Sequence, residues 1–395
     1  MTMKVRALIV LLVVASTMWL AGCGHYTCGT TFGASSCDAG NGGLNQGNGG
    51  TTKGTYLLIA DAGGIQGEVL DPTAGTIKIT SGFGTVSTPQ TNNFPGDWMV
   101  VAGGKYMYAG YQETGLIYGW TLNGDGTITS ISGVSPMSAI SLFTNFSSGT
   151  QTIVANPAGT LLFVLDQNSQ QVDIYQIATD GSLSSNPTVI QLPSGFVPVN
   201  LAVDGQGRFL YISNLVGIET TQVAVFNIGT STLSPPVAMT LQQMQGEASG
   251  TYMIGTRVDF ATFDQNIHVM SINSSTGALT EVGTGFPTAD VPVQVAVQPN
   301  TGGTLVYSID ADGSVDGATL NLTTGTLTAV ANSPFSLEAL SGEFDPAGKY
   351  FFVVEGASLD HSSLFAYDVS ASPDITTSIA SVGWAAGAWQ PFDTQ

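Results

Sequence analysis

Histidine is the residue type that most often moves protons in catalysis near neutral pH, and the chain holds three. His25 lies near the N-terminus, and His361 lies in a turn-like stretch. His268 takes the polar position of an alternating segment, Ile267-His-Val-Met-Ser-Ile272, so we interpret it as a surface residue of a strand. No Ser–His–Asp set can be assembled, so the sequence assigns no catalytic residue.

Arg257 and Asp259 are the candidate ligand contacts. They follow the apolar segment Tyr252-Met-Ile-Gly-Thr, which is typical of a strand, so we expect both residues in the turn after it, at one rim of the propeller predicted below. Because the chain has only eight Lys and Arg, an arginine at a rim could bind an anion or a carboxylate ligand. The alternative is an internal salt bridge of Arg257 with Asp259 or Glu219.

Three aspartates form the only candidate metal ligands. Asp310, Asp312 and Asp316 alternate with other residues beside a glycine, and such oxygen-rich loops suit Ca²⁺. The twelfth position of an EF-hand loop would need Glu, and here it holds Asn321. We therefore expect a solvated turn, and neither a metal nor a cofactor.

The N-terminus predicts export. Lys4 and Arg6 precede the apolar run of residues 7–15, which is too short for a spanning helix and typical of a signal peptide. Leu20-Ala-Gly-Cys23 resembles the lipobox of bacterial lipoproteins. The resemblance implies cleavage of residues 1–22 and acylation of Cys23, with palmitate among the acyl chains, which would attach the protein to a membrane.

Residues 23–53 are expected to form a tether. The segment is rich in Gly and Asn and has no apolar period, as in a flexible linker. Cys28 and Cys37 are either a disulfide of an oxidising compartment or two free thiols. We expect an extracytoplasmic protein that is lipid-anchored to the bacterial cell envelope. Gly24 after the cysteine favours the outer membrane, where the cell has one.

Composition sets further limits on function. Charged residues make up 9% of the chain, hydrophobic residues 43%, and the formal net charge is -20. So acidic a protein repels phosphate backbones, which argues against nucleic acid as a partner. The apolar content and the 50 glycines suit many short strands joined by tight turns.

An internal repeat determines the predicted fold. A glycine, one further residue and then an apolar or aromatic run recur every 43 to 55 residues, at Gly54, Gly104, Gly159, Gly207, Gly250, Gly303 and Gly348. A second marker, a turn followed by an aliphatic residue, keeps the same phase, at Ile77, Ile128, Leu183, Leu233, Leu279, Leu327 and, in degenerate form, Pro373-Asp-Ile375. Each unit contains four strand-like segments.

Four antiparallel strands in such a period describe the blade of a propeller. We predict an all-β, seven-bladed β-propeller of four-stranded antiparallel blades over residues 54–395. The first marker has no inner strand before it, and a spare segment, 378–389, follows the last outer strand, which we place near Ile375. The C-terminal strand is expected to fill the vacant position in the first blade and close the ring, so deletion after Ala371 should destabilise the domain.

The segment Val203-Asp-Gly-Gln-Gly-Arg-Phe-Leu-Tyr-Ile-Ser-Asn214, followed by Val223-Ala-Val-Phe-Asn-Ile228, resembles the lactonase-type propellers. These include the propeller 6-phosphogluconolactonases and the repeats named for a Tyr-Val-Thr-Asn strand. The resemblance implies the same fold, and in the family His, Glu and Arg point into the central channel to bind a sugar acid or open a lactone. This sequence departs from that pattern, since Asn200 occupies the inner strand, Leu215 follows Ser-Asn, and residues 152–156 lack His.

Two functions follow from these observations. The first is a membrane-tethered, non-catalytic propeller that binds an unidentified envelope protein or glycan. The alternative is a lactonase-like hydrolase that acts on a sugar lactone with a relocated active site. Converging His, Arg and Glu side chains at the channel would favour the hydrolase, and a channel lined by Ser, Thr, Val and Gly would favour the binding module.

Overall fold

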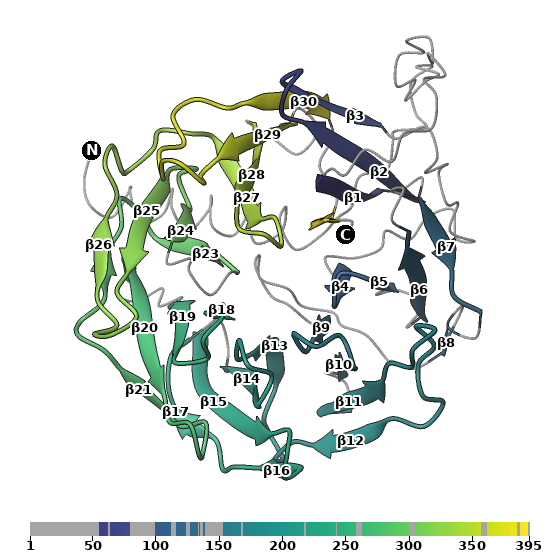
Figure 1. Cartoon of the computed structure of the whole chain (residues 1–395). Coiled ribbons are helices and arrows are strands. Elements are labelled where there is room, and N and C mark those ends of the chain that lie inside the picture. The colour runs from purple at the N-terminus through teal and green to yellow at the C-terminus, as the bar shows by residue number, and fades with distance from the viewer. Residues whose placement is uncertain are drawn as a thin grey trace, which may run out of the picture.

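The computed structural model is a ring of β-sheets around a central channel (Figure 1). It describes residues 55–393 except 62–63, 80–98, 112–115, 124–126, 133, 135–136, 139–152, 167–168, 217–218, 242, 258–262, 300–304, 357–361 and 385–387. Within these residues every regular element is a strand. The signal peptide, the tether, Cys23, Cys28 and Cys37 lie outside the described residues.

Seven blades follow one another around the ring, and the prediction of a seven-bladed propeller is confirmed. The inner strands line the channel: β31 (Ala388–Asp393), β4 (Met99–Ala102), β9 (Ile153–Ala155), β13 (Pro198–Val203), β18 (Met244–Gly246), β23 (Pro292–Val297) and β27 (Ala339–Phe344). The second strands follow the marker glycines: β1 (Thr55–Asp61), β5 (Tyr106–Tyr111), β10 (Leu161–Asp166), β14 (Phe209–Val216), β19 (Tyr252–Thr256), β24 (Leu305–Asp310) and β28 (Tyr350–Glu355).

Two further strands complete each blade. The third strands are β2 (Gly64–Asp71), β6 (Leu116–Leu122), β11 (Gln171–Gln176), β15 (Glu219–Asn227), β20 (Asn266–Ile272), β25 (Val315–Leu320) and β29 (Ser362–Asp368). The outer strands are β3 (Thr76–Ile79), β7 (Ile128–Ser130), β12 (Thr188–Gln191), β16 (Thr232–Leu233), β21 (Leu279–Glu281), β26 (Leu327–Ala329) and β30 (Ala380–Trp384). Two-residue strands β8 (Met137–Ser138), β17 (Val237–Ala238) and β22 (Phe286–Pro287) also pair with third strands.

The marker glycine turns the chain from the inner strand into the second strand. Gly159 has φ +64°, a left-handed conformation that glycine adopts without strain. A Cβ at Gly159 would also lie 2.7 Å from the backbone nitrogen of Gly103 in the preceding blade. Glycine is therefore required here both by the turn and by the close approach of two blades.

Burial of the second strands holds the blades together. All six residues of β24 are buried, because neighbouring blades cover both faces of the strand. The same arrangement recurs along the chain and forms apolar clusters between successive blades, such as the one that contains Tyr307, Phe344 and Phe351. The interior is therefore a series of apolar layers between neighbouring sheets.

The C-terminal strand closes the ring as predicted. β31 pairs antiparallel with β1 from Thr55 opposite Asp393 to Ala60 opposite Ala388, so the two ends of the body share one sheet. A bridge between β3 and β30, at Thr76 and Ser381, joins the same two blades at their outer edge. The first and last blades thus form one eight-stranded sheet.

The predicted position of the closing strand within the C-terminal segment was wrong. Residues 380–384 form β30, the outer strand of the last blade, and the closing strand begins later, at Ala388. The degenerate marker does not pair as a strand because Pro373 lacks an amide donor and Asp374 caps a turn by accepting the backbone N–H of Thr376. Ile375 is fully buried, so this segment fills space while the outer strand starts at Ala380.

A similar displacement occurs in the third blade. Leu183 of the second marker makes an isolated bridge with Ile177, and the outer strand β12 starts five residues later, at Thr188. The described residues include no helix long and apolar enough to cross a membrane.

Candidate functional site

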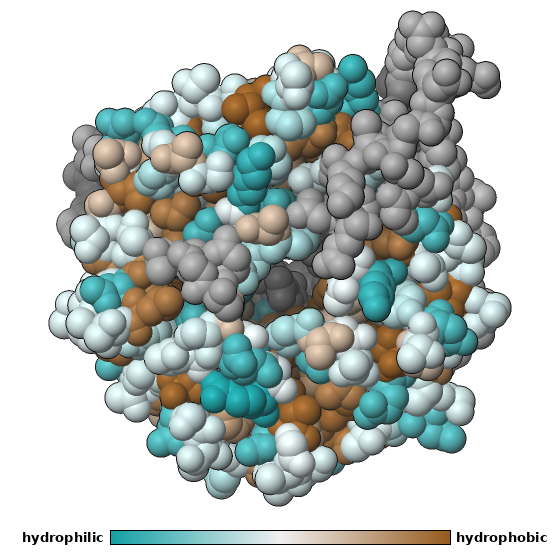
Figure 2. Space-filling model, viewed as in Figure 1, coloured by the Kyte–Doolittle hydropathy of each residue, from teal (hydrophilic) through white to brown (hydrophobic). Residues whose placement is uncertain are grey.

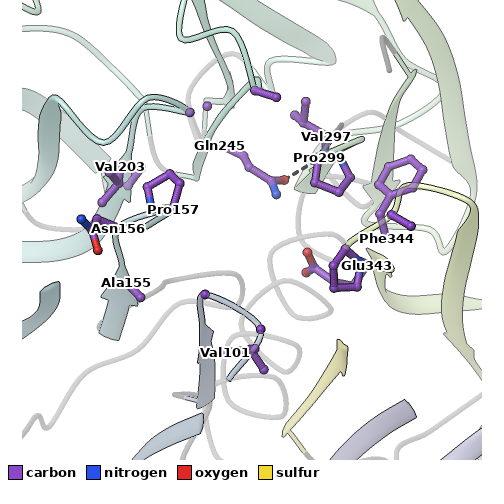
Figure 3. A pocket seen from close by; sticks show the side chains of 18 of the residues that line it. Val101, Ala155, Asn156, Pro157, Val203, Gln245, Val297, Pro299, Glu343 and Phe344 are labelled. Atoms are coloured by element: carbon purple, nitrogen blue, oxygen red, sulfur yellow. Dashed lines mark hydrogen bonds between the residues drawn. The ribbon is translucent and has the colours of Figure 1, made fainter. Parts of the chain in front are cut away.

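A cavity of about 680 Å³ occupies the central channel. Its walls are the ends of the inner strands and the turns that follow them, contributed by six blades (Figure 3). Most of the described lining residues are Gly, Ala, Val or Pro. In the space-filling view the face of the ring is hollowed near its centre, and polar and apolar residues are interspersed around it (Figure 2). The channel is thus large enough for a small ligand.

Glu343 is the only charged residue of the described lining. It lies on β27, opposite Phe352 of β28, and its carboxyl points into the cavity (Figure 3). Because the surrounding protein removes water from the carboxylate, the pKa of Glu343 is raised to about 7. At neutral pH this group can therefore both accept and release a proton.

Gln245 is the longest uncharged polar side chain of the lining. It lies on β18, opposite Ile254 of β19, and its Oε1 accepts the backbone N–H of Val297 at 2.9 Å. Ile254 and Phe352 are each the third residue of their second strand, counted from the aromatic Tyr252 and Tyr350. Gln245 and Glu343 therefore occupy the same level of the channel.

The cations of the body lie away from the cavity. After residue 54 the chain has five Lys and Arg, all of them described and none lining the channel: Lys78, Lys105, Arg208, Arg257 and Lys349. Arg208 is held by Asp204 at 2.8 Å, and Lys349 lies over the ring of Tyr350. Lys78 and Lys105 are exposed. The described part of the site is accordingly acidic.

Arg257 lies in a cluster of charges at the edge of the fifth blade. Its guanidinium donates to Glu281 Oε2 at 2.7 Å and lies 4.0 Å from Asp264. The internal salt bridge expected for this arginine exists, but its partners differ from the predicted ones. Asp259 lies outside the described residues.

His268 belongs to the same cluster, and its interpretation as a surface residue was wrong. The side chain is 2% exposed, with Nδ1 2.7 Å from Glu281 Oε1 and Nε2 3.0 Å from Asp264 Oδ2. Its carboxylate partners come from an outer strand and from the chain before β20, so alternation along β20 could not reveal them. The hydrogen bond to His268 and the charge of Arg257 outweigh partial burial and lower the pKa of Glu281.

The three candidate metal ligands do not converge. Asp312 is turned to its own loop, where it accepts from the hydroxyl and the backbone N–H of Ser314. Asp310 and Asp316 are buried side by side, and burial together with the neighbouring carboxyl raises the pKa of Asp310 to about 8. No group of three or more His, Cys, Asp or Glu among the residues described could hold a metal ion.

Reasoning from the sequence missed Glu343 and Gln245, the two longest polar side chains of the cavity lining. Glu343 and Gln245 each precede the first aromatic residue of a second strand by seven positions, at Tyr350 and Tyr252. Alignment of the seven repeats on that aromatic position would have placed both residues on inner strands, facing the channel.

The chain resembles solved propeller structures, although no family model matches it and no curated protein is significantly similar in sequence. The periplasmic gluconolactonase of Pseudomonas aeruginosa is 16% identical, with a TM-score of 0.61, and the match covers 86% of this chain and 100% of that one. A protein from Lactobacillus plantarum is 17% identical, with a TM-score of 0.59 and the same coverage.

A candidate 6-phosphogluconolactonase from Bacteroides fragilis is 14% identical, with a TM-score of 0.53, and the match again covers 86% of this chain and 100% of that one. At these identities the likeness describes the fold. The body of the chain therefore shares the β-propeller fold of these proteins.

Proposed function

We propose that the protein is a hydrolase of uncharged sugar lactones that uses Glu343 as its general base. The observation that carries this proposal is a carboxyl with a pKa of about 7 that points into a 680 Å³ channel cavity. A base whose pKa lies near the working pH combines a useful deprotonated fraction with sufficient basicity. The lactonase-type fold and the structural similarity to the periplasmic gluconolactonase support the choice of a lactone as substrate.

The reaction needs one water and one proton carrier. The Glu343 carboxylate takes a proton from the water while the water oxygen bonds to the lactone carbonyl carbon. The resulting tetrahedral intermediate collapses as the ring C–O bond breaks, and the Glu343 carboxyl returns the proton to the departing ring oxygen. The product is an open hydroxy acid, whose negative charge disfavours its retention beside Glu343.

The charge of the body favours a substrate without phosphate. All five Lys and Arg after residue 54 are outside the cavity lining, and two of them are bound to carboxylates of the protein. Phosphate recognition relies on Arg, Lys or backbone N–H groups aimed at the ligand. A phosphorylated lactone would meet the Glu343 carboxylate without a neighbouring cation, so we expect clear preference for the unphosphorylated ring.

The location of the protein is part of the proposal. The signal-like N-terminus and the Leu20-Ala-Gly-Cys23 motif support export and lipid attachment at Cys23. The structurally similar gluconolactonase from Pseudomonas aeruginosa is a periplasmic protein, which supports an extracytoplasmic place for this chain as well. Attachment is tested by mass spectrometry of the mature N-terminus, with Cys23→Ser as the control that cannot be acylated.

Lactone turnover tests the proposed activity. The initial rate of acid release from D-glucono-δ-lactone is measured in weak buffer, with spontaneous hydrolysis subtracted. We expect the wild type to exceed the spontaneous rate and Glu343→Gln to lose about 100-fold or more of kcat/KM. The matched control is Glu338→Gln, which changes an exposed glutamate just before the same strand β27 and should keep wild-type turnover.

A second candidate is the non-catalytic binding module for an envelope protein or glycan. The mostly Gly, Ala, Val and Pro lining favours it, since such walls offer shape and few reactive groups. Absence of turnover above the spontaneous rate for any uncharged sugar lactone would overturn the hydrolase and leave this candidate.

A further inference from the structure

Three glutamines, two on inner strands and Gln243 directly before β18, reach across to the next blade. Gln294 binds the backbone of Gly342 through both ends of its amide, donating to the carbonyl at 2.9 Å and accepting the N–H at 3.2 Å. Gln243 binds Val295 in the same way, accepting its N–H and donating to its carbonyl at 3.3 Å. In both amides the oxygen and the nitrogen are thus each hydrogen-bonded to the neighbouring inner strand.

Gln245 differs from these two in one respect. Its Oε1 accepts the N–H of Val297 at 2.9 Å, but its Nε2 has no partner among the residues that the structure describes. The amide lies at the cavity wall, with the nitrogen on the side of the open channel (Figure 3).

The contact with Val297 fixes the orientation of this amide. A rotation by 180° would place the Nε2 donor against the N–H of Val297, which is also a donor, and lose the hydrogen bond. The Nε2 hydrogens are therefore held toward the cavity before any ligand enters. A donor positioned in advance needs no reorganisation when charge develops on a bound oxygen.

We infer that Gln245 Nε2 binds the carbonyl oxygen of the lactone ring and holds it while the Glu343-activated water attacks. This assignment rests on the proposed function. Gln245 and Glu343 stand at one level of the channel on the fifth and seventh blades, so a carbonyl between them can receive a donor from one side and a water from the other. The amide would then stabilise the oxyanion that forms on attack.

Two glutamine variants provide the test. Gln245→Met removes the cavity donor and one contact with the next blade, whereas Gln243→Met removes two such contacts from a buried side chain that does not line the cavity. We expect kcat for D-glucono-δ-lactone to fall about 100-fold in Gln245→Met, the size typical of a lost oxyanion donor. Gln243→Met should keep its kcat within about threefold, although it loses more structural hydrogen bonds.

A binding measurement separates this assignment from the activity itself. D-glucono-δ-lactam carries the same ring carbonyl and resists hydrolysis, and its affinity can be measured by titration calorimetry. We expect about tenfold weaker lactam binding to Gln245→Met than to the wild type and unchanged binding to Gln243→Met. Gln245→Glu, which keeps an acceptor for Val297, should lose the same kcat and shift the pH midpoint of kcat/KM upward, because a second carboxylate faces Glu343.

The outcomes are distinguishable. Lactone turnover with unchanged kcat and lactam affinity in Gln245→Met would overturn the donor role and leave the hydrolase intact. Lactam binding that depends on Gln245, without lactone turnover, would overturn the hydrolase and keep the donor. A wild type that neither binds the lactam nor opens the lactone would overturn both.

Discussion

The phenol of Tyr211 donates a hydrogen bond to the carbonyl of Gly277 at 3.0 Å, which joins the second strand of the fourth blade to an outer turn of the fifth. Tyr108 donates to Gly181 at 2.7 Å and Tyr307 to Pro373 at 2.6 Å in the same way. Each of these tyrosines is the third residue of its second strand, so one position of the repeat fastens successive blades.

Removal of this hydroxyl should weaken the ring. We expect Tyr211→Phe to lower the free energy of unfolding by about 1–2 kcal/mol, because the ring still packs but the buried carbonyl of Gly277 loses its donor. The control is Tyr175→Phe on β11, a buried tyrosine whose hydroxyl forms no hydrogen bond to another blade among the residues described, and the change should be under about 0.5 kcal/mol. Urea unfolding followed by fluorescence compares the two, and equal losses would contradict the role given to Tyr211.

Glu68 is a buried carboxyl in an apolar position of the first blade. It is 0% exposed, and neither oxygen has a partner among the described residues. Equivalent positions of other blades hold Trp120, Tyr175, Phe226 and Met270. Burial raises the pKa of Glu68 to about 7, so its charged form destabilises the folded state.

We expect Glu68→Met to stabilise the protein, and more so at alkaline pH. Because the folded-state pKa is above the unfolded one, the stability contributed by the protonated carboxyl is present at low pH and is lost as pH rises through about 7. The gain should be about 1–3 kcal/mol at pH 8 and smaller at pH 5. Denaturant unfolding at both pH values measures it, and equal gains would contradict the titration of Glu68.

The Asp310 and Asp316 pair predicts a second pH effect. Since burial and Asp316 raise the pKa of Asp310 to about 8, its contribution to stability is complete below pH 4 and declines until about pH 8. Asp310→Asn should retain a hydrogen-bonding group and flatten the stability profile over that range. Asp312→Asn, at an exposed position of the same turn, is the control and should leave the slope unchanged.

The sequence predicted the ring because the turn and core requirements are local. The positive φ of Gly159 and the two-sided burial of β24 recur at a fixed phase, so a repeat of glycine and apolar residues reports both. The displaced outer strand of the last blade escaped detection because Asp374 and Pro373 accept hydrogen bonds from distant residues, Asn332 and Tyr307, that the pattern does not encode.

The candidate site was harder to predict for a geometric reason. The cavity exists only where inner strands from distant repeats converge, and no motif along the chain joins Gln245 to Glu343. The charge cluster of His268 has the same origin, since its carboxylates come from segments on either side of β20. The sequence could single out residues such as His268, but which residues lie beside them is determined only when the ring closes.

A variant of Arg257 tests which of two candidate sites is used: the rim contact that the sequence suggested or the channel cavity. Since its guanidinium is bound to Glu281 and lies outside the cavity lining, Arg257→Ala should keep lactone turnover within about twofold of the wild type, as expected for a residue without contact to substrate. The variant should lose about 1–2 kcal/mol of stability, because Glu281 and Asp264 lose the guanidinium that lies beside them. Parallel kinetic and unfolding measurements test this. A loss of about 100-fold in kcat/KM at wild-type stability would show that Arg257 belongs to the active site.

The closing strand provides the strictest test of the architecture. A chain that ends at residue 387 lacks β31 and leaves the inner edge of β1 unpaired over six residue pairs, from Thr55 to Ala60. We expect its thermal midpoint to fall by about 10 °C or more. The truncation should cost several kcal/mol of stability, and each kcal/mol lowers the midpoint of a domain of this size by about 2 °C. The control ends at Asp393 and keeps the whole of β31, so it should melt like the full chain. If the chain truncated at 387 unfolds with the same midpoint and cooperativity, the ring does not depend on β31. The bridge between β3 and β30 would then suffice to join the first and last blades.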